Sequence, residues 1–232
     1  MDKWYIESRQ PTLFGKNPII WFWTKDFYVE EISRDLANKI IVENHYSKKF
    51  YNATYIHLWV FIDKELIWVL QYWYAMNPAS QSSVVKDTEQ DEYLELNRMW
   101  LDDVAPKNSE SQAIWYSIKY IKRKYKKIKW IQSFADERCW CYGIVYQACN
   151  FLFYGEHLSK FWELDWETFH NSIMTSEKAW PRWYNLLNHP DNKDRVIKHE
   201  LRQFRYIYFI KKWQKEKCLL KEKKYLKYYN ND

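Results

Sequence analysis

The stretch YQACNFLFYGE, residues 146–156, joins a short amphipathic segment to an apolar one without a linker between them. We predict a helix over residues 142–150 that ends at Asn150, followed directly by a strand over FLFYGE, residues 151–156. A helix that passes straight into a buried strand is typical of a mixed α/β domain.

The segments on either side predict the same alternation of helices and strands. Before the junction we expect a strand over 93–103, a helix from caps at Asn108 and Ser109 to about Tyr125, and a strand over 129–136. Nearer the N-terminus we expect a strand over 28–33, a helix from Ser33 to Asn44, and a hairpin of two β-rich runs joined at Asp63-Lys64. Elsewhere the patterns predict an exposed loop over 77–92, no clear element over 160–194, a strand over 201–210, and a helix or an unanchored arm after Lys211.

Length and composition predict one domain with an addition. The 232 residues are 47% hydrophobic, enough to fill a core. No apolar run approaches the roughly 18 residues of a membrane-spanning helix, and the N-terminus lacks a signal-peptide pattern. The four cysteines form neither a zinc-binding nor a disulfide pattern, which predicts reduced thiols in a cytoplasmic protein. We expect a main domain over 1–194 and a basic strand and arm over 195–232.

Positive charge is concentrated in two segments. Residues 195–232 hold twelve Lys or Arg against four Asp or Glu, and residues 119–129 hold seven cations without an acid. Both segments contain aromatic residues among the cations. Because cations neutralise phosphates and aromatic rings can stack on bases, the two segments favour a polyanionic partner such as DNA.

The glycine and tryptophan contents are both unusual. The chain has three glycines and fifteen tryptophans, although average usage would give about sixteen glycines. Several tryptophans stand where a turn or a small residue is expected. We therefore hypothesise that the source genome reads UGA as glycine and that these positions were translated as tryptophan.

The helix-to-strand junction resembles a stretch of the form Tyr-x-x-x-Gly-Phe-x-x-x-Gly that acyl-CoA transferases of the GNAT type often carry. In this chain the pattern reads Tyr146, Asn150 in the place of the first glycine, Phe151 and Gly155. The resemblance implies a GNAT-like fold, in which two neighbouring parallel strands splay apart and the pantetheine of the cofactor lies in the opening.

The pyrophosphate loop of that fold corresponds here to DDVAPKNSES, residues 102–111, which contains no glycine. Asn108, Ser109 and Ser111 still supply N–H and side-chain donors at the start of a helix, where anions bind. The same residues would also serve an ordinary helix cap. The motif therefore leaves the donor, an acyl-CoA or a related compound, open.

Three stretches in combination resemble the Mom family of phage DNA-modification proteins. They are HYS at 45–47, ELNRMWLDDVAPKNSES at 95–111, and SFAD at 133–136 with Tyr146 ten residues later. The resemblance covers roughly residues 29–170 and implies a GNAT-related enzyme that converts DNA adenine to an N6-carbamoylmethyl form and so blocks restriction. The functional residues that it implies are His45, Tyr46, Arg98, Ser111, Asp136 and Tyr146. One departure is ERCWCY at 137–142, where a glycine-rich loop is expected.

The chemistry of these residues suits adenine. Its amino group is a poor nucleophile and is paired in a duplex, so an enzyme must extract the base and help to remove an N–H proton. Asp136 at a strand end would act as the base or orienting group, and Tyr146 would give a proton to the departing group. His45 and Tyr46 would supply polar or stacking contacts.

Two other functions fit parts of the sequence. An acyl-CoA N-acetyltransferase acting on a protein or a small amine would bind acetyl-CoA and leave DNA nucleosides unchanged. A non-catalytic nucleic-acid-binding protein would bind DNA irrespective of Asp136 and Tyr146. A metal bound by His45, Asp136 and a tyrosine is conceivable, but the spacing does not establish it, and no pattern in the sequence encodes the oligomeric state.

Overall fold

The computed structural model describes residues 27–45, 54–62, 65–74, 78–102, 108–137, 142–175, 177–178 and 180–226. Contacts divide the chain into two compact units. Unit 1 comprises Met1–Phe134, Gly143–Gly155 and Arg205–Asp232, and unit 2 comprises Ala135–Tyr142 and Glu156–Phe204. The division expected at residue 194 stays a prediction.

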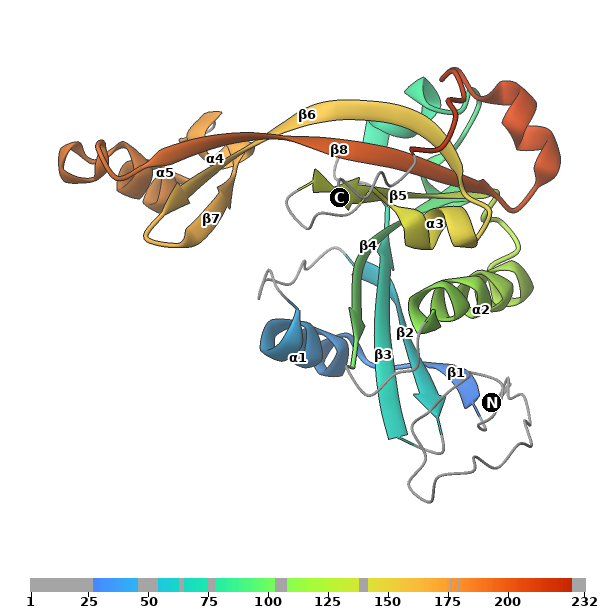
Figure 1. Ribbon diagram of the computed structural model, residues 1–232. Helices are drawn as coiled ribbons and strands as arrows, with labels where there is room; N and C mark the ends of the chain where they lie inside the picture. Colours follow the sequence, from blue (N-terminus) through green and yellow to red (C-terminus); the bar gives the residue numbers. More distant parts are fainter. Residues whose placement is uncertain are drawn as a thin grey trace, which may run out of the picture. The chain divides into compact units, whose positions relative to one another are not determined.

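The described strands form one mixed sheet in the order β1-β2-β3-β4-β5-β8-β6-β7 (Figure 1). Strands β1 to β4 pair antiparallel in sequence order, and β5 then pairs parallel to β4. The parallel step needs a crossover, which helix α2 provides. The bounds are β1 Phe27–Glu31, β2 Thr54–Ile62, β3 Glu65–Trp73, β4 Tyr93–Leu101, β5 Trp130–Asp136, β6 Leu152–Leu164, β7 Glu167–His170 and β8 Ile197–Phe209. The GNAT-like α/β fold and its predicted hairpin are thereby confirmed.

Strands β4 and β5 pair over only part of their length. The register joins Tyr93–Leu96 to Trp130–Ser133 and then stops, while β4 stays paired with β3 as far as Leu101. The last residues of β4 and β5 are therefore not joined to each other. This is the splayed pair of parallel strands that a GNAT-like fold requires.

Helices α1 (Arg34–Asn44) and α2 (Ser109–Lys124) cover opposite faces of β3 (Figure 1). Ala37 and Ile41 of α1 pack against Val69. On the other face, the Tyr72 hydroxyl lies 2.5 Å from Ser117 Oγ of α2. Because successive residues of a strand point to opposite faces, Val69 and Tyr72 face different helices. The predicted extents of both helices are confirmed to within two residues, and Ser33 caps α1 as predicted, whereas the Asn108 side chain makes no capping hydrogen bond to α2.

The junction at residues 146–156 consists of the end of a short helix, α3 (Ile144–Ala148), and the start of β6. The helix is shorter than the predicted 142–150. Asn150 has φ 60°, a left-handed conformation that asparagine adopts more readily than most residues. Asn150 therefore adopts the left-handed conformation for which glycine is usual at this position.

The C-terminal tail is fixed to unit 1 as far as residue 226. A 3₁₀ helix, η6 (Lys212–Lys217), is followed by isolated bridges from Cys218 to Val85 and from Lys223 to Phe153. The short helix agrees with one of the two predictions for this segment. An unanchored arm is wrong for residues 212–226.

Unit 2 contains the elements that the sequence left unassigned. Helices α4 (Asn171–Thr175) and α5 (Pro181–Asn188) surround a small core with the hairpin of β6 and β7. The core consists of Leu164, Phe169 and Leu187, with partly buried neighbours that include Trp162 and Trp183. Within the part of the chain that the structure describes, no helix combines the length and apolar character needed to cross a membrane.

Candidate active site

His45 lies at the C-terminal end of α1. It caps the helix with its backbone N–H, which donates to Ile41 O at 2.9 Å, and its side chain is buried. Tyr46, the next predicted site residue, lies outside the described residues. His45 therefore lies at the end of α1, on the face of the sheet that α1 covers.

Arg98 lies on β4, opposite Gln71 of β3. Gln71 is completely buried, and its Nε2 donates to Asn38 Oδ1 of α1 at 3.0 Å and lies 3.3 Å from His57 Nδ1. Arg98 therefore belongs to the face of the sheet that α1 covers. Burial, followed by the nearby Arg34 charge, lowers the pKa of His57 and favours its neutral form.

Glu95 continues this polar face and was not among the predicted site residues. Its carboxylate accepts hydrogen bonds from Trp73 Nε1 at 3.0 Å and from Gln132 Nε2 at 2.9 Å. Burial raises the pKa of Glu95, although these two hydrogen bonds and the charges of Arg205 and Arg98 oppose the rise. A buried acid bridged to two neighbouring strands thus lies beside the point where β4 and β5 separate.

The start of α2 carries the residues that the sequence predicts to hold a phosphate. Asn108 has φ 68°, and its side chain does not cap the helix. Ser111 Oγ donates to Asn108 O at 2.9 Å, and Ser109 is completely buried. Asn108 and Ser111 are thus the accessible members of the predicted set, at the positive end of a 16-residue helix dipole.

Tyr146 projects from α3 into an aromatic cluster of unit 1. Its ring centroid lies 5.6 Å from that of Phe151 and 5.5 Å from that of Tyr206. The Cys149 thiol at the end of α3 donates to Ser111 O at 2.9 Å, which ties the Tyr146 helix to the start of α2. Burial raises the pKa of the Cys149 thiol to about 12, so this cysteine is not an activated nucleophile.

Asp136 is the last residue of β5 and is partly exposed. It belongs to unit 2, whereas Tyr146 belongs to unit 1, so the convergence of these two residues stays a prediction. The next residue, Glu137, is held by Arg202, whose backbone N–H, Nε and Nη2 donate to the carboxylate at 2.5–2.9 Å. Among the described residues, no group of three His, Cys, Asp or Glu side chains has a geometry suited to a metal ion.

The two basic segments meet in unit 1. The Lys211 backbone N–H donates to Lys129 O at 2.9 Å, although the two residues are far apart in sequence. Part of the charge is neutralised, because Lys124, Lys127 and Lys129 pair with Glu31, Asp91 and Glu92. Cations of these two segments that form no ion pair with any residue the structure describes include Lys122, Lys126, Lys211, Lys212, Lys221 and Lys224.

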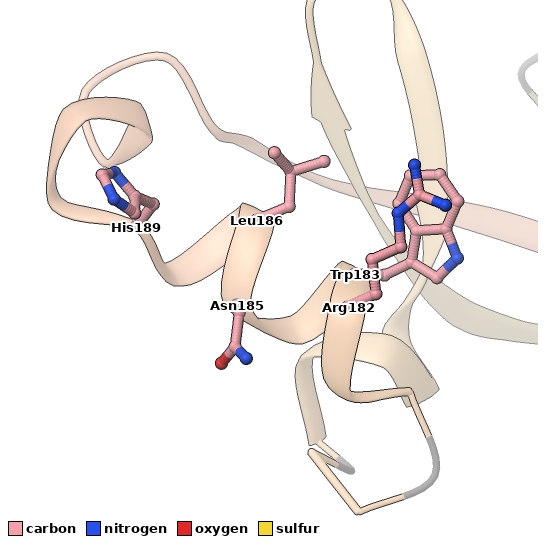
Figure 2. A pocket seen from close by; sticks show the side chains of 5 residues that line it. All are labelled: Arg182, Trp183, Asn185, Leu186 and His189. Atoms are coloured by element: carbon pink, nitrogen blue, oxygen red, sulfur yellow. The ribbon is translucent and has the colours of Figure 1, made fainter.

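A separate hollow lies on α5 of unit 2 (Figure 2). It is lined by Arg182, Trp183, Asn185, Leu186 and His189, and contains none of the predicted site residues. The Arg182 guanidinium lies 5.0 Å from the centre of the Trp183 ring. The residues that line this hollow are therefore different from the predicted site residues.

The sequence model of the Mom protein family matches residues 26–227. A curated relative, the methylcarbamoylase Mom of Escherichia phage Mu, is 47% identical over 194 residues, which cover 84% of this chain and 80% of the relative.

Solved structures with a similar arrangement are N-acetyltransferases of low sequence identity. A spermidine/spermine N-acetyltransferase from Vibrio cholerae has a TM-score of 0.48 at 10% identity, covering 82% of this chain and 96% of that chain. An N-acetyltransferase from Staphylococcus aureus has a TM-score of 0.47 at 11% identity, covering 79% of this chain and 98% of that chain.

Proposed function

Because the chain belongs to the Mom protein family, we propose that it is a transferase that modifies the exocyclic amine of adenine in double-stranded DNA. The product is an N6-carbamoylmethyl-type adenine, which protects phage DNA from restriction. The observation that carries the proposal is 47% identity, over most of both chains, to a relative named methylcarbamoylase. The site of action is the cytoplasm of a bacterial host.

The catalytic roles fall to residues on or directly after three elements. Asp136, at the end of β5, accepts a proton from the adenine amino group, whose nucleophilicity rises as the N–H bond breaks. Tyr146 on α3 donates its hydroxyl proton to the departing group. His45 and Tyr46, which follow α1, hold the base by polar and stacking contacts.

The donor is held on the opposite side of the sheet from α1. Asn108 and Ser111 at the start of α2 would hold the phosphates of a coenzyme A-type or related donor. Because the product joins N6 to a CH₂ carbon, the donor carries its leaving group on that CH₂ and not on an acyl carbonyl: the N6–CH₂ bond forms as the bond from CH₂ to the leaving group breaks. Arg98 lies on the face that α1 covers, so it would add its positive charge from the strand that borders the splayed region and not from the side of the sheet on which α2 lies. Support for this assignment comes from the left-handed Asn108, whose side chain makes no capping hydrogen bond to the helix.

Duplex DNA is the proposed partner, and the target base leaves the stack to reach the site. The unpaired lysines of the tail contribute affinity through the phosphates, a contribution that weakens with salt.

Mass spectrometry of nucleosides from DNA co-expressed with the protein tests this function. We expect a deoxyadenosine derivative heavier by one carbamoylmethyl group, absent from cells that carry an empty vector. Unmodified deoxyadenosine together with tight acetyl-CoA binding would favour the N-acetyltransferase alternative instead.

A further inference from the structure

A β-bulge in β4 coincides with the point where β4 and β5 separate. Gln71 pairs with Arg98 and Tyr72 pairs with Leu96, so Asn97 is the additional residue on β4. Pairing with β5 ends at Leu96. Asn97 is therefore the first residue of β4 after the stretch that pairs with β5. Bulges often occur beside active sites, where they redirect a side chain.

The side-chain amide of Asn97 has unused hydrogen-bonding capacity. Both Oδ1 and Nδ2 are shielded from solvent, and neither has a hydrogen-bond partner among the residues that the structure describes. The backbone of the same residue is engaged, since Arg98 Nη1 donates to Asn97 O at 2.8 Å. Burying an amide without partners costs stability, so its presence calls for an explanation.

Neighbouring amides differ from Asn97 in this respect. Gln132 of β5 and Gln71 of β3 each use Nε2, to bind Glu95 and Asn38, and leave only Oε1 without a partner among the described residues. Of these three amides, Asn97 alone leaves both its donor and its acceptor unused. It is thus the group best suited to a ligand that itself has both a donor and an acceptor.

We infer that Asn97 binds the carboxamide of the group that is transferred to adenine, an inference that rests on the proposed function. A primary carboxamide has a C=O acceptor and an NH₂ donor side by side, and the Asn97 amide presents the complementary pair. Two parallel hydrogen bonds can then form. An acetyl group has no donor, so the same contact selects a carbamoylmethyl group over an acetyl group.

The test replaces the amide by an apolar side chain of similar size, Asn97→Leu. Gln214 in η6 provides a matched control, because it is also buried with both amide atoms lacking a partner among the described residues. Each variant is compared with the wild-type chain in three measurements: the melting temperature, the affinity for duplex DNA, and the modified deoxyadenosine in co-expressed DNA.

We expect both variants to melt at or above the wild-type temperature, because an unpaired buried amide has been removed. Both should bind DNA normally, but Asn97→Leu should yield about 10²-fold less modified adenine while Gln214→Leu yields the wild-type amount. If Asn97→Leu does not fold, the smaller Asn97→Ala should show the same loss. Wild-type modification by a folded Asn97 variant would overturn the inference, whereas a wild-type chain that modifies no adenine would refute the proposed function itself.

Discussion

Two residues with positive φ lie in a turn where the usual sequence would contain glycine. Asp165 and Trp166 have φ 50° and 68° and form the two-residue turn between β6 and β7. Both central residues of such a turn need positive φ, which favours Asp-Gly. The Trp166 side chain is 94% exposed and therefore gains little from packing. This is the context expected if a UGA codon for glycine was translated as tryptophan.

We predict that Trp166→Gly stabilises the protein by roughly 1 kcal/mol relative to Trp166→Ala, because only glycine adopts this conformation without a Cβ penalty. The comparison with alanine removes the indole in both variants and isolates the backbone effect. Urea unfolding measures the difference. Equal stability of the two variants would mean that the turn carries no strain.

The residues of the candidate site differ in how well the sequence predicts them. Asn150 was identifiable because it replaces a glycine within a recognisable pattern, and its positive φ agrees. Glu95, Gln132 and Asn97 were not identified. Strand alternation predicts only the face on which a side chain lies, and the bulge at Asn97 shifts that alternation by one residue.

At the scale of elements, the position of α3 depends on Gly143. A Cβ added there would lie 2.2 Å from Tyr206 Cε2, and φ is +77°. The Tyr206 ring has little freedom to move, since it is completely buried and its hydroxyl accepts from Gln147 Nε2 at 3.0 Å. The close approach of Gly143 to Tyr206 therefore fixes the position of α3, the helix that carries Tyr146.

We therefore predict that Gly143→Ala destabilises the protein by roughly 2–4 kcal/mol, from backbone strain together with the steric overlap. Gly155→Ala is the control, because its φ is also positive but the nearest atoms are Cε and Nζ of the flexible Lys223 side chain, at 3.0 Å. Its cost should stay near the strain alone, roughly 1–2 kcal/mol. Thermal unfolding of the two variants distinguishes these values, and a Gly143→Ala variant as stable as Gly155→Ala would contradict the packing argument.

The two long helices of unit 1 were predictable, and the short elements of unit 2 were not. The 11-residue α1 and the 16-residue α2 repeat their apolar positions often enough to define a period. In unit 2, β7 has four residues, α4 five and α5 eight. Elements this short contain only one or two helical turns or strand alternations, which are too few to define a period in the sequence. Their structure depends on tertiary packing around Leu164, Phe169 and Leu187.

At the scale of the whole molecule, the tail combines packing with charge. Lys86 N–H donates to Lys217 O, and Leu219 N–H donates to Val84 O, both at 2.9 Å. Deleting residues 212–232 would therefore remove part of the core of unit 1 along with the charge. Substitution of the unpaired lysines separates the two effects.

We predict that replacing Lys211, Lys212, Lys221 and Lys224 by Gln weakens DNA binding and flattens its dependence on salt. The log–log slope should fall by about 0.9 for each phosphate that the variant no longer neutralises. The fold should persist, because these side chains make no ion pair with any residue the structure describes.

A control with the same change in net charge replaces Lys160, Lys178, Lys193 and Lys198 of unit 2 by Gln. Fluorescence anisotropy with labelled duplex DNA measures the salt slopes of both variants. Equal slopes would show that the tail has no specific role in binding.

Asp136 and Tyr146 are the residues with which we propose that this chain modifies DNA adenine. The most direct test is the amount of modified deoxyadenosine, measured by mass spectrometry in DNA co-expressed with the wild type, Asp136→Asn or Tyr146→Phe. Both substitutions keep size and shape and should cost under about 0.5 kcal/mol of stability if the groups serve chemistry rather than packing. We predict abundant modification by the wild type and about 10²–10⁴-fold less by each folded, DNA-binding variant. Near wild-type modification by both variants would contradict the assigned site, and unmodified adenine with the folded wild-type protein would contradict the function.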